Sequence, residues 1–203
     1  MNRSAVDTDL KFFTNQPNST LHDRFVSTLP DAQFFDVLVG YFRLSGFHYL
    51  YRHLEDVEKI RILVGINVGE ETFEYYEAAQ HELDMESFEE AEEQYFEQVR
   101  EELEYSDDAE EIEQGIRTFI EWLQSGKLEL RVYPSEDIHA KVYISRFPES
   151  DRDYGRVITG SSNFSESGFA AKRDFNVELK DRRDVEFAED QFEKLWSEST
   201  DVT

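Results

Sequence analysis

Two residue types suited to phosphate chemistry stand two positions apart in the segment IHAKVYIS, residues 138–145. A histidine can act as a nucleophile or general base and a lysine supplies a fixed positive charge, so His139 and Lys141 together suit the handling of a phosphate group. The alternating pattern predicts a strand on which His139, Lys141 and Tyr143 share one face. The same pattern also fits polar residues on the wet face of a sheet, with Tyr143 serving packing rather than chemistry.

A second polar group follows the strand-like segment RVITG, residues 156–160. Gly160 allows the chain to turn sharply, and the next three residues offer hydroxyl, amide and backbone N–H donors to phosphate oxygens. These donors are Ser161, Ser162 and Asn163. Asn176 and Glu178 follow on another predicted strand, two residues apart and therefore on one face. The segment predicts a phosphate-binding loop at the end of a strand.

The elements around these residues predict an α/β domain with a mixed sheet and helices on both faces. Apolar runs at residues 34–42 and 59–66, separated by a helical pattern that begins at Ser45, predict a parallel strand–helix–strand unit. Helices are also predicted from an N-cap at Asn18 or Ser19 to Pro30 and over residues 184–197. The remaining predicted strands lie at residues 128–134, 138–145, 156–160 and 175–180.

The negative charge of the chain is concentrated in one segment. The 203 residues carry 46 acids and 21 bases, a net charge of −25, but residues 70–113 alone hold 20 of the acids and one base. Residues 131–183 carry 10 bases and 9 acids, so the candidate site is spared the acidity. Two amphipathic patterns, residues 85–103 and 112–123, predict an acidic helical insertion over about residues 70–126. Its outer face is either solvated or a surface for a protein partner.

The composition restricts the class of protein further. There is no cysteine and no apolar run near the roughly 20 residues that a membrane span needs, so a cytoplasmic protein is predicted. The acids show no metal-ligand spacing and there is no Walker-type loop, so neither a metal nor another cofactor is predicted. An acid-rich, lysine-poor chain is typical of halophilic proteins, although an ordinary acidic protein with one very acidic helix pair gives the same composition.

The ordered set of motifs resembles the phospholipase D superfamily. The family's histidine and lysine match His139 and Lys141, its Gly-Ser matches Gly160 and Ser161, and its asparagine and downstream glutamate match Asn163 and Glu178. The resemblance covers roughly residues 21–196. It implies a metal-independent phosphodiesterase that works through a covalent phosphohistidine.

Two departures from the family pattern bear on this expectation. The family's Asp, five residues after the lysine, is replaced by Arg146, which weakens a lipase assignment more than a nuclease one and leaves open an inactive docking module. The chain also holds a single H-x-K motif. The resemblance then implies a homodimer in which two copies of His139 face each other across a twofold axis, one attacking and one acting as acid.

A nucleic acid is the favoured substrate. The opening residues resemble the phospholipase D-like module at the N-terminus of helicase-type and restriction proteins, so residues 1–203 are expected to be one domain of a longer protein that acts on DNA. A net charge of −25 disfavours anionic membranes and also weakens DNA binding at low salt. The candidate DNA contacts are the basic residues near the motif: Arg146, Arg156, Lys172 and Arg173.

Overall fold

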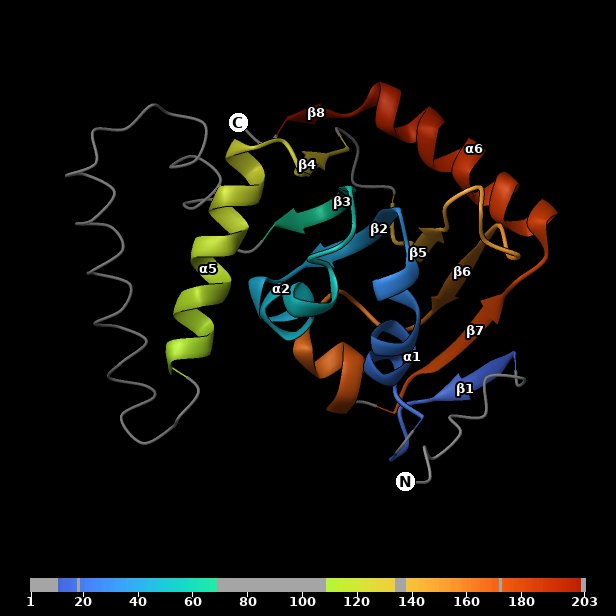
Figure 1. The fold of residues 1–203 in the computed structure, drawn as a ribbon, viewed down its shortest axis with the longest axis horizontal. Helices are drawn as coiled ribbons and strands as arrows, with labels where there is room; N and C mark the ends of the chain where they lie inside the picture. Colours follow the sequence, from blue (N-terminus) through green and yellow to red (C-terminus); the bar gives the residue numbers. More distant parts are fainter. Residues whose placement is uncertain (1–10, 18, 69–108, 134–137, 172, 202–203) are drawn as a thin grey trace.

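The computed structural model describes residues 11–17, 19–68, 109–133, 138–171 and 173–201. They form an eight-stranded mixed sheet in the order β1-β7-β6-β5-β2-β3-β4-β8, flanked by helices on both faces (Figure 1). The strands are β1 (Phe12–Thr14), β2 (Phe34–Phe42), β3 (Lys59–Val68), β4 (Leu128–Val132), β5 (Lys141–Arg146), β6 (Gly155–Gly160), β7 (Phe175–Leu179) and β8 (Thr200–Asp201). The helices are α1 (Leu21–Thr28), α2 (Leu44–Leu50), α5 (Ala109–Gln124) and α6 (Arg182–Glu198), with short turns η1 (Leu29–Asp31), η2 (Tyr51–His53) and η3 (Ser167–Ala171). The predicted α/β class is confirmed.

The predicted strand–helix–strand unit forms the parallel half of the sheet. β2 pairs in parallel with β3, and β3 with β4. On the other side of β2, the strands β5, β6, β7 and β1 follow in antiparallel order. β2 is central and covered on both faces, and its nearly continuous apolar sequence suits that position.

Helices α1, α2 and α5 cover one face of the sheet, where Phe25, Phe47 and Phe119 pack on the strands. Helix α1 begins at Thr20, whose Oγ1 accepts from the Asp23 N–H (3.0 Å) while the Asp23 carboxylate accepts from the Thr20 N–H (2.9 Å). This capping box needs an acid or amide three residues after the cap, and Asp23 stands in that relation to Thr20 alone. The predicted caps, Asn18 and Ser19, are therefore wrong.

Helix α5 confirms the second helix predicted for the acidic insertion. Its buried stripe comprises Ile116, Phe119, Ile120 and Leu123. It ends before Gly126, which has φ +72 and so adopts the left-handed conformation common after helix ends. The first predicted helix, residues 85–103, lies outside the described residues.

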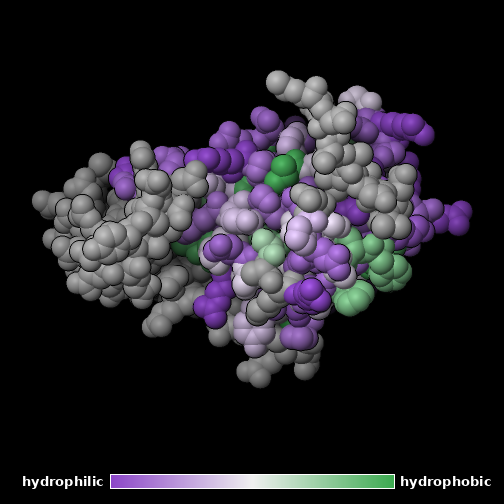
Figure 2. Space-filling model, turned by 90° about the horizontal axis from the view of Figure 1, so that it is seen from below, coloured by the Kyte–Doolittle hydropathy of each residue, from purple (hydrophilic) through white to green (hydrophobic). Residues whose placement is uncertain are grey.

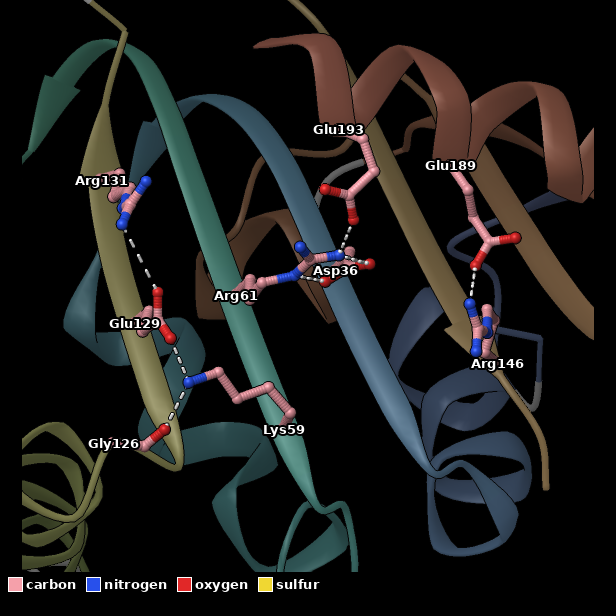
Figure 3. Close-up of polar contacts among 9 residues, drawn as sticks. All are labelled: Asp36, Lys59, Arg61, Gly126, Glu129, Arg131, Arg146, Glu189 and Glu193. Carbon is pink, nitrogen blue, oxygen red and sulfur yellow. Dashed lines mark hydrogen bonds and ion pairs between the residues drawn. The ribbon is translucent and has the colours of Figure 1, made fainter. Parts of the chain in front are cut away.

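Helix α6 covers the opposite face, where Val185, Phe192 and Trp196 pack on apolar side chains of β2, β3, β5 and β6. A polar contact fastens the helix to the sheet: Arg61 donates to both Asp36 oxygens (2.7 and 2.8 Å) and pairs with Glu193 (2.6 Å; Figure 3). The predicted helix over residues 184–197 is confirmed.

The sequence missed both edge strands, β1 and β8, which are three and two residues long. It also placed the start of β5 too early, because the strand begins at Lys141 and His139 precedes it. Within the described ranges, none of the helices has the length and apolar character required to cross a membrane.

Candidate functional site

His139 and Lys141 come together at the start of β5, as their spacing predicts. His139 is exposed, whereas Lys141 is 8% exposed, and Lys141 Nζ lies 3.4 Å from His139 Nε2. An ammonium has only donors, so in a hydrogen bond between these two atoms Nε2 would accept through its lone pair and the ring proton would lie on Nδ1. Such a nitrogen is a nucleophile placed beside a fixed positive charge.

The face of the sheet that carries Lys141 is not solvent-exposed. Tyr143, two residues on, is buried among Phe25, Phe164 and Phe169 under the helical layer. Its hydroxyl donates to the Ser162 carbonyl (2.7 Å), which ties β5 to the loop after β6. Burial, together with the negative charge of Asp174, raises the pKa of Tyr143 well above its usual value, so the phenol remains a donor. Tyr143 therefore serves packing and loop placement.

Gly160 ends β6 beside Lys141, because the register that pairs Val142 with Thr159 continues to these two residues. A Cβ on Gly160 would lie 2.2 Å from the Phe175 carbonyl oxygen and 2.4 Å from Asn176 Oδ1. The close approach of β7 therefore requires glycine here. The backbone is not left-handed at this position, since Gly126 is the glycine with positive φ in the described part of the chain.

Asp174 organises the two serines of the loop, a role that the sequence did not reveal. Ser161 Oγ donates to Asp174 Oδ1 (2.7 Å) and Ser162 Oγ donates to Oδ2 (3.2 Å). Asn176 Nδ2 in turn donates to Ser162 Oγ (3.0 Å). Both hydroxyl hydrogens are thus directed at one carboxylate rather than toward open space. An acid just before β7, facing a Gly-Ser-Ser turn, was the signal available in the sequence.

Two amides of the site hold buried oxygens without a partner among the described residues, Asn163 Oδ1 and Asn176 Oδ1. A buried polar atom without a partner is costly, and such atoms concentrate where a ligand or water completes the bonding. Rotation of the Asn163 amide exchanges its oxygen for the NH₂ group and presents a donor. Asn163 is therefore suited to a phosphate oxygen.

Glu178 lies two residues further from the strand end than the other predicted site residues, in the next row of side chains across the sheet. The pairs Gly160–Asn176 and Ile158–Glu178 place Asn176, not Glu178, in the row of Lys141. The Glu178 carboxylate forms an ion pair with Arg24 of α1 (2.7 Å), and these side chains are 3% and 1% exposed. Arg156 and Lys180 lie farther from it, at 3.6 and 3.8 Å. An arginine on the buried stripe of α1 was the signal that it needed a buried acid.

The structure does not bring the predicted DNA-contact arginines to one place. Arg146 is at the opposite end of β5 from Lys141, about 16 Å away at about 3.3 Å per residue, and pairs with Glu189 of α6 (2.8 Å; Figure 3). Arg156 lies at that same far end, opposite Ser145, and pairs with Asp153. Arg173 is exposed near the loop, and Lys172 lies outside the described residues.

Few charged or polar groups are available at the site to bind a metal ion or an anion. In the described part of the chain, no cluster of three or more histidine and carboxylate side chains could hold a metal ion. The donors at this end of β5 and β6 include the Lys141 ammonium and the amides of the loop after β6, which suit an anionic phosphate.

Residues 59–196 match the family model described as the cardiolipin synthase, PLD-like domain, and this range contains strands β3 to β7 and the motif described above. The chain belongs to the phospholipase D-like superfamily. The matched region spans well over half of the chain, as the resemblance of the motifs predicted. No curated protein sequence matches the chain.

Solved structures share the fold of this phospholipase D-like domain. NucT from Helicobacter pylori is similar with a TM-score of 0.51 and 12% identity, over 94% of this chain and 96% of that one. The archaeal chromatin protein TrmBL2 has a TM-score of 0.50 and 13% identity, over 98% of this chain and 56% of that one. Nuc of Salmonella typhimurium, a phospholipase D family member, has a TM-score of 0.49 and 14% identity, over 94% and 95% of the two chains.

Proposed function

We propose that this domain is a metal-independent phosphodiesterase that cleaves DNA with His139 as nucleophile. The observation that carries the proposal is the contact of His139 Nε2 with Lys141 Nζ, 3.4 Å, at the strand end that also carries the Gly160–Asn163 loop. Membership of the phospholipase D-like superfamily supports the same chemistry.

The reaction takes two steps. Nε2 donates its lone pair to phosphorus and forms a P–N bond, while the P–O bond to the leaving group breaks and that oxygen takes a proton from an acid. Water then attacks phosphorus and breaks the P–N bond. The group that served as the acid in the first step, now deprotonated, acts as the base and takes the proton of the water. Lys141 and the Asn163 amide stabilise the charge on the non-bridging oxygens. Ser161 and Ser162 contribute by shaping the loop, since their hydroxyl hydrogens are directed at Asp174.

A second histidine is needed as the acid, and the chain has one H-x-K motif. We assign this role to His139 of a second copy in a twofold dimer. The exposure of His139 supports the assignment, because the imidazole is accessible to a partner.

DNA is the substrate that we favour. TrmBL2, a chromatin protein of similar fold, binds DNA, and this supports a nucleic-acid partner for the present chain. We further propose that the domain works within a longer chain of a helicase or restriction system, a proposal that rests on the resemblance of its opening residues to such modules.

The second candidate is a non-catalytic dimerisation or DNA-docking module. Two observations favour it: Arg146 replaces the family's Asp, and Arg24 holds Glu178 in a buried ion pair. Arg146 nevertheless contacts Glu189 of α6 at the end of β5 opposite Lys141, so the replacement lies away from His139.

The deciding experiment is hydrolysis of a phosphodiester reporter and of labelled DNA in EDTA. Wild type and His53→Ala, which removes a histidine of η2, should be equally active, whereas His139→Ala should lose several orders of magnitude. Lys141→Ala and Asn163→Ala should each lose about 10² to 10³ in rate. Activity that requires Mg²⁺, or a wild type inactive at all pH values and salt concentrations that still binds DNA through Lys141, would favour the alternatives.

A further inference from the structure

Three phenylalanines are far more exposed than any other large apolar residue of the described ranges. Phe12 of β1 is 71% exposed, Phe175 of β7 is 72% and Phe187 of α6 is 66%. They belong to β1, β7 and the first turns of α6, and Figure 2 shows a green, apolar area on one side of the molecule. Aromatic rings exposed to this degree are unfavourable in water, and a surface that gathers them is a candidate binding site.

Phe12 and Phe175 lie next to each other on one face of the sheet edge. Phe12 is paired with Val177, and Phe175 stands two residues from Val177 on the same strand. Since side chains alternate, both rings project to the face opposite Asn176, as diagonal neighbours about 7 Å apart. They form a two-ring platform.

This platform borders the proposed phosphate loop. The Phe175 N–H donates to Ser161 Oγ (3.1 Å) and the Ser161 N–H donates to the Phe175 carbonyl (3.1 Å). Phe175 also directly follows Asp174, the carboxylate that holds both serines. An exposed ring is thus fixed by the backbone to the loop on which the phosphate is proposed to rest.

Cations accompany both rings, although the chain as a whole is strongly acidic. Lys11 precedes Phe12, and Arg173 stands two residues before Phe175, and both are exposed. Aromatic rings interleaved with cations provide the two contacts that a polynucleotide offers, base faces and phosphates. A second copy of this chain, although acidic, does not present anionic groups at regular spacing with flat aromatic faces between them, as a polynucleotide does.

We propose that Phe175 and Phe12 are a stacking platform, on the sheet face opposite Lys141, for bases of single-stranded nucleic acid whose backbone passes over the phosphate loop. The inference rests on the proposed function and specifies its substrate as a single strand. Bases in a duplex are stacked on each other and do not expose their faces, so a duplex gains nothing from the rings. Stacking does not depend on charge, and therefore gives affinity to a domain whose net charge of −25 opposes phosphates.

The test is a binding titration with a labelled single strand, a strand of equal length with abasic sites, and a hairpin duplex. Phe175→Ala should weaken binding of the base-bearing strand by about five- to one-hundred-fold, the range found for loss of one stacked base. Phe175→Tyr should retain the wild-type affinity for the base-bearing strand. Phe175→Leu should lose it, because Leu is apolar but not aromatic. All variants should bind the abasic strand and the duplex with the same affinity as wild type.

The matched control is Phe187→Ala. Phe187 is nearly as exposed and lies on the same side of the molecule, but lines a cavity of about 300 Å³ between α6 and the sheet rather than the loop. Its removal should leave single-strand binding unchanged. In turnover, Phe175→Ala should raise KM for the single strand with kcat nearly constant.

Several outcomes separate this inference from the function beneath it. If wild type cleaves or binds DNA but Phe175→Ala binds the base-bearing strand equally well, the proposed platform is wrong. The proposed phosphodiesterase function is then unaffected. If Phe175→Leu binds like wild type, or if Phe175→Ala and Phe187→Ala both dissociate a dimer in sedimentation, the surface is a protein interface and the platform is refuted. A wild type that neither binds nor cleaves nucleic acid overturns both.

Discussion

The candidate site depends on contacts between residues that are far apart in the sequence. His139, Lys141 and the Gly160–Asn163 loop can be recognised because each is a local pattern on or beside a strand. Arg24 and Glu178 are 154 positions apart, so their ion pair follows from the packing of α1 on β7 and from no local pattern. The same holds for Asp174, which is 13 residues from the serine that it orients.

The buried pair assigns Glu178 a structural role. Glu178→Met or Arg24→Met alone should lower the free energy of unfolding by about 3–5 kcal/mol, because either removes the shortest ion pair of a buried charge. The double variant should cost much less than the sum of the two. Urea unfolding of all four proteins measures this coupling.

Arg117→Ala is the control, since its contact with Glu113 is largely exposed and should contribute little. Additive single losses would contradict the structural role. A Glu178→Met protein that is as stable as wild type yet inactive would return Glu178 to the chemistry.

At the scale of elements, the sequence predicted those with a strong hydrophobic period. β2, β3, α5 and α6 each bury a long stripe or run, and each was found near its observed bounds. β1 and β8 are too short to show a period, and edge strands are defined by their neighbour rather than by their own sequence. The start of β5 was misplaced because alternation also continues through residues 138–140, where the ladder with β2 has stopped.

The contact of α2 with α5 should depend on pH. Burial of His48 against Gly115 lowers the pKa of the imidazole to about 4, from 6.5. Because the folded protein binds this proton less readily than the unfolded chain, the stabilisation is complete above about pH 6.5 and is lost as the pH falls toward 4. The shift corresponds to roughly 3 kcal/mol.

Urea unfolding at pH 7 and pH 4.5 should therefore show a smaller pH dependence for His48→Leu than for wild type. Other acids titrate equally in both proteins, so the difference between the two dependences isolates His48. His53→Leu serves as the control on the adjacent turn. Equal pH dependence in wild type and His48→Leu would show that His48 is not buried as described.

At the scale of the whole molecule, the net charge of −25 opposes compaction. Salt reduces this repulsion, since the Debye length falls from about 10 Å at 0.1 M to about 3 Å at 1 M. The melting temperature should therefore rise between 0.1 M and 2 M KCl. An uncharged osmolyte at equal osmolality should give a smaller rise, and equal rises would argue against a halophilic design.

The dimer proposal makes a sharper prediction about mixtures. If each active site needs His139 from two copies, a heterodimer of wild type and His139→Ala is inactive. After subunit exchange with a nine-fold excess of His139→Ala, about one wild-type subunit in ten pairs with another, so activity per wild-type subunit should fall to about a tenth. The control is the same mixture assayed at once, before exchange. Activity that stays proportional to the amount of wild type after exchange, with sedimentation showing mixed dimers, would mean that one His139 suffices and that the acid comes from within the same chain.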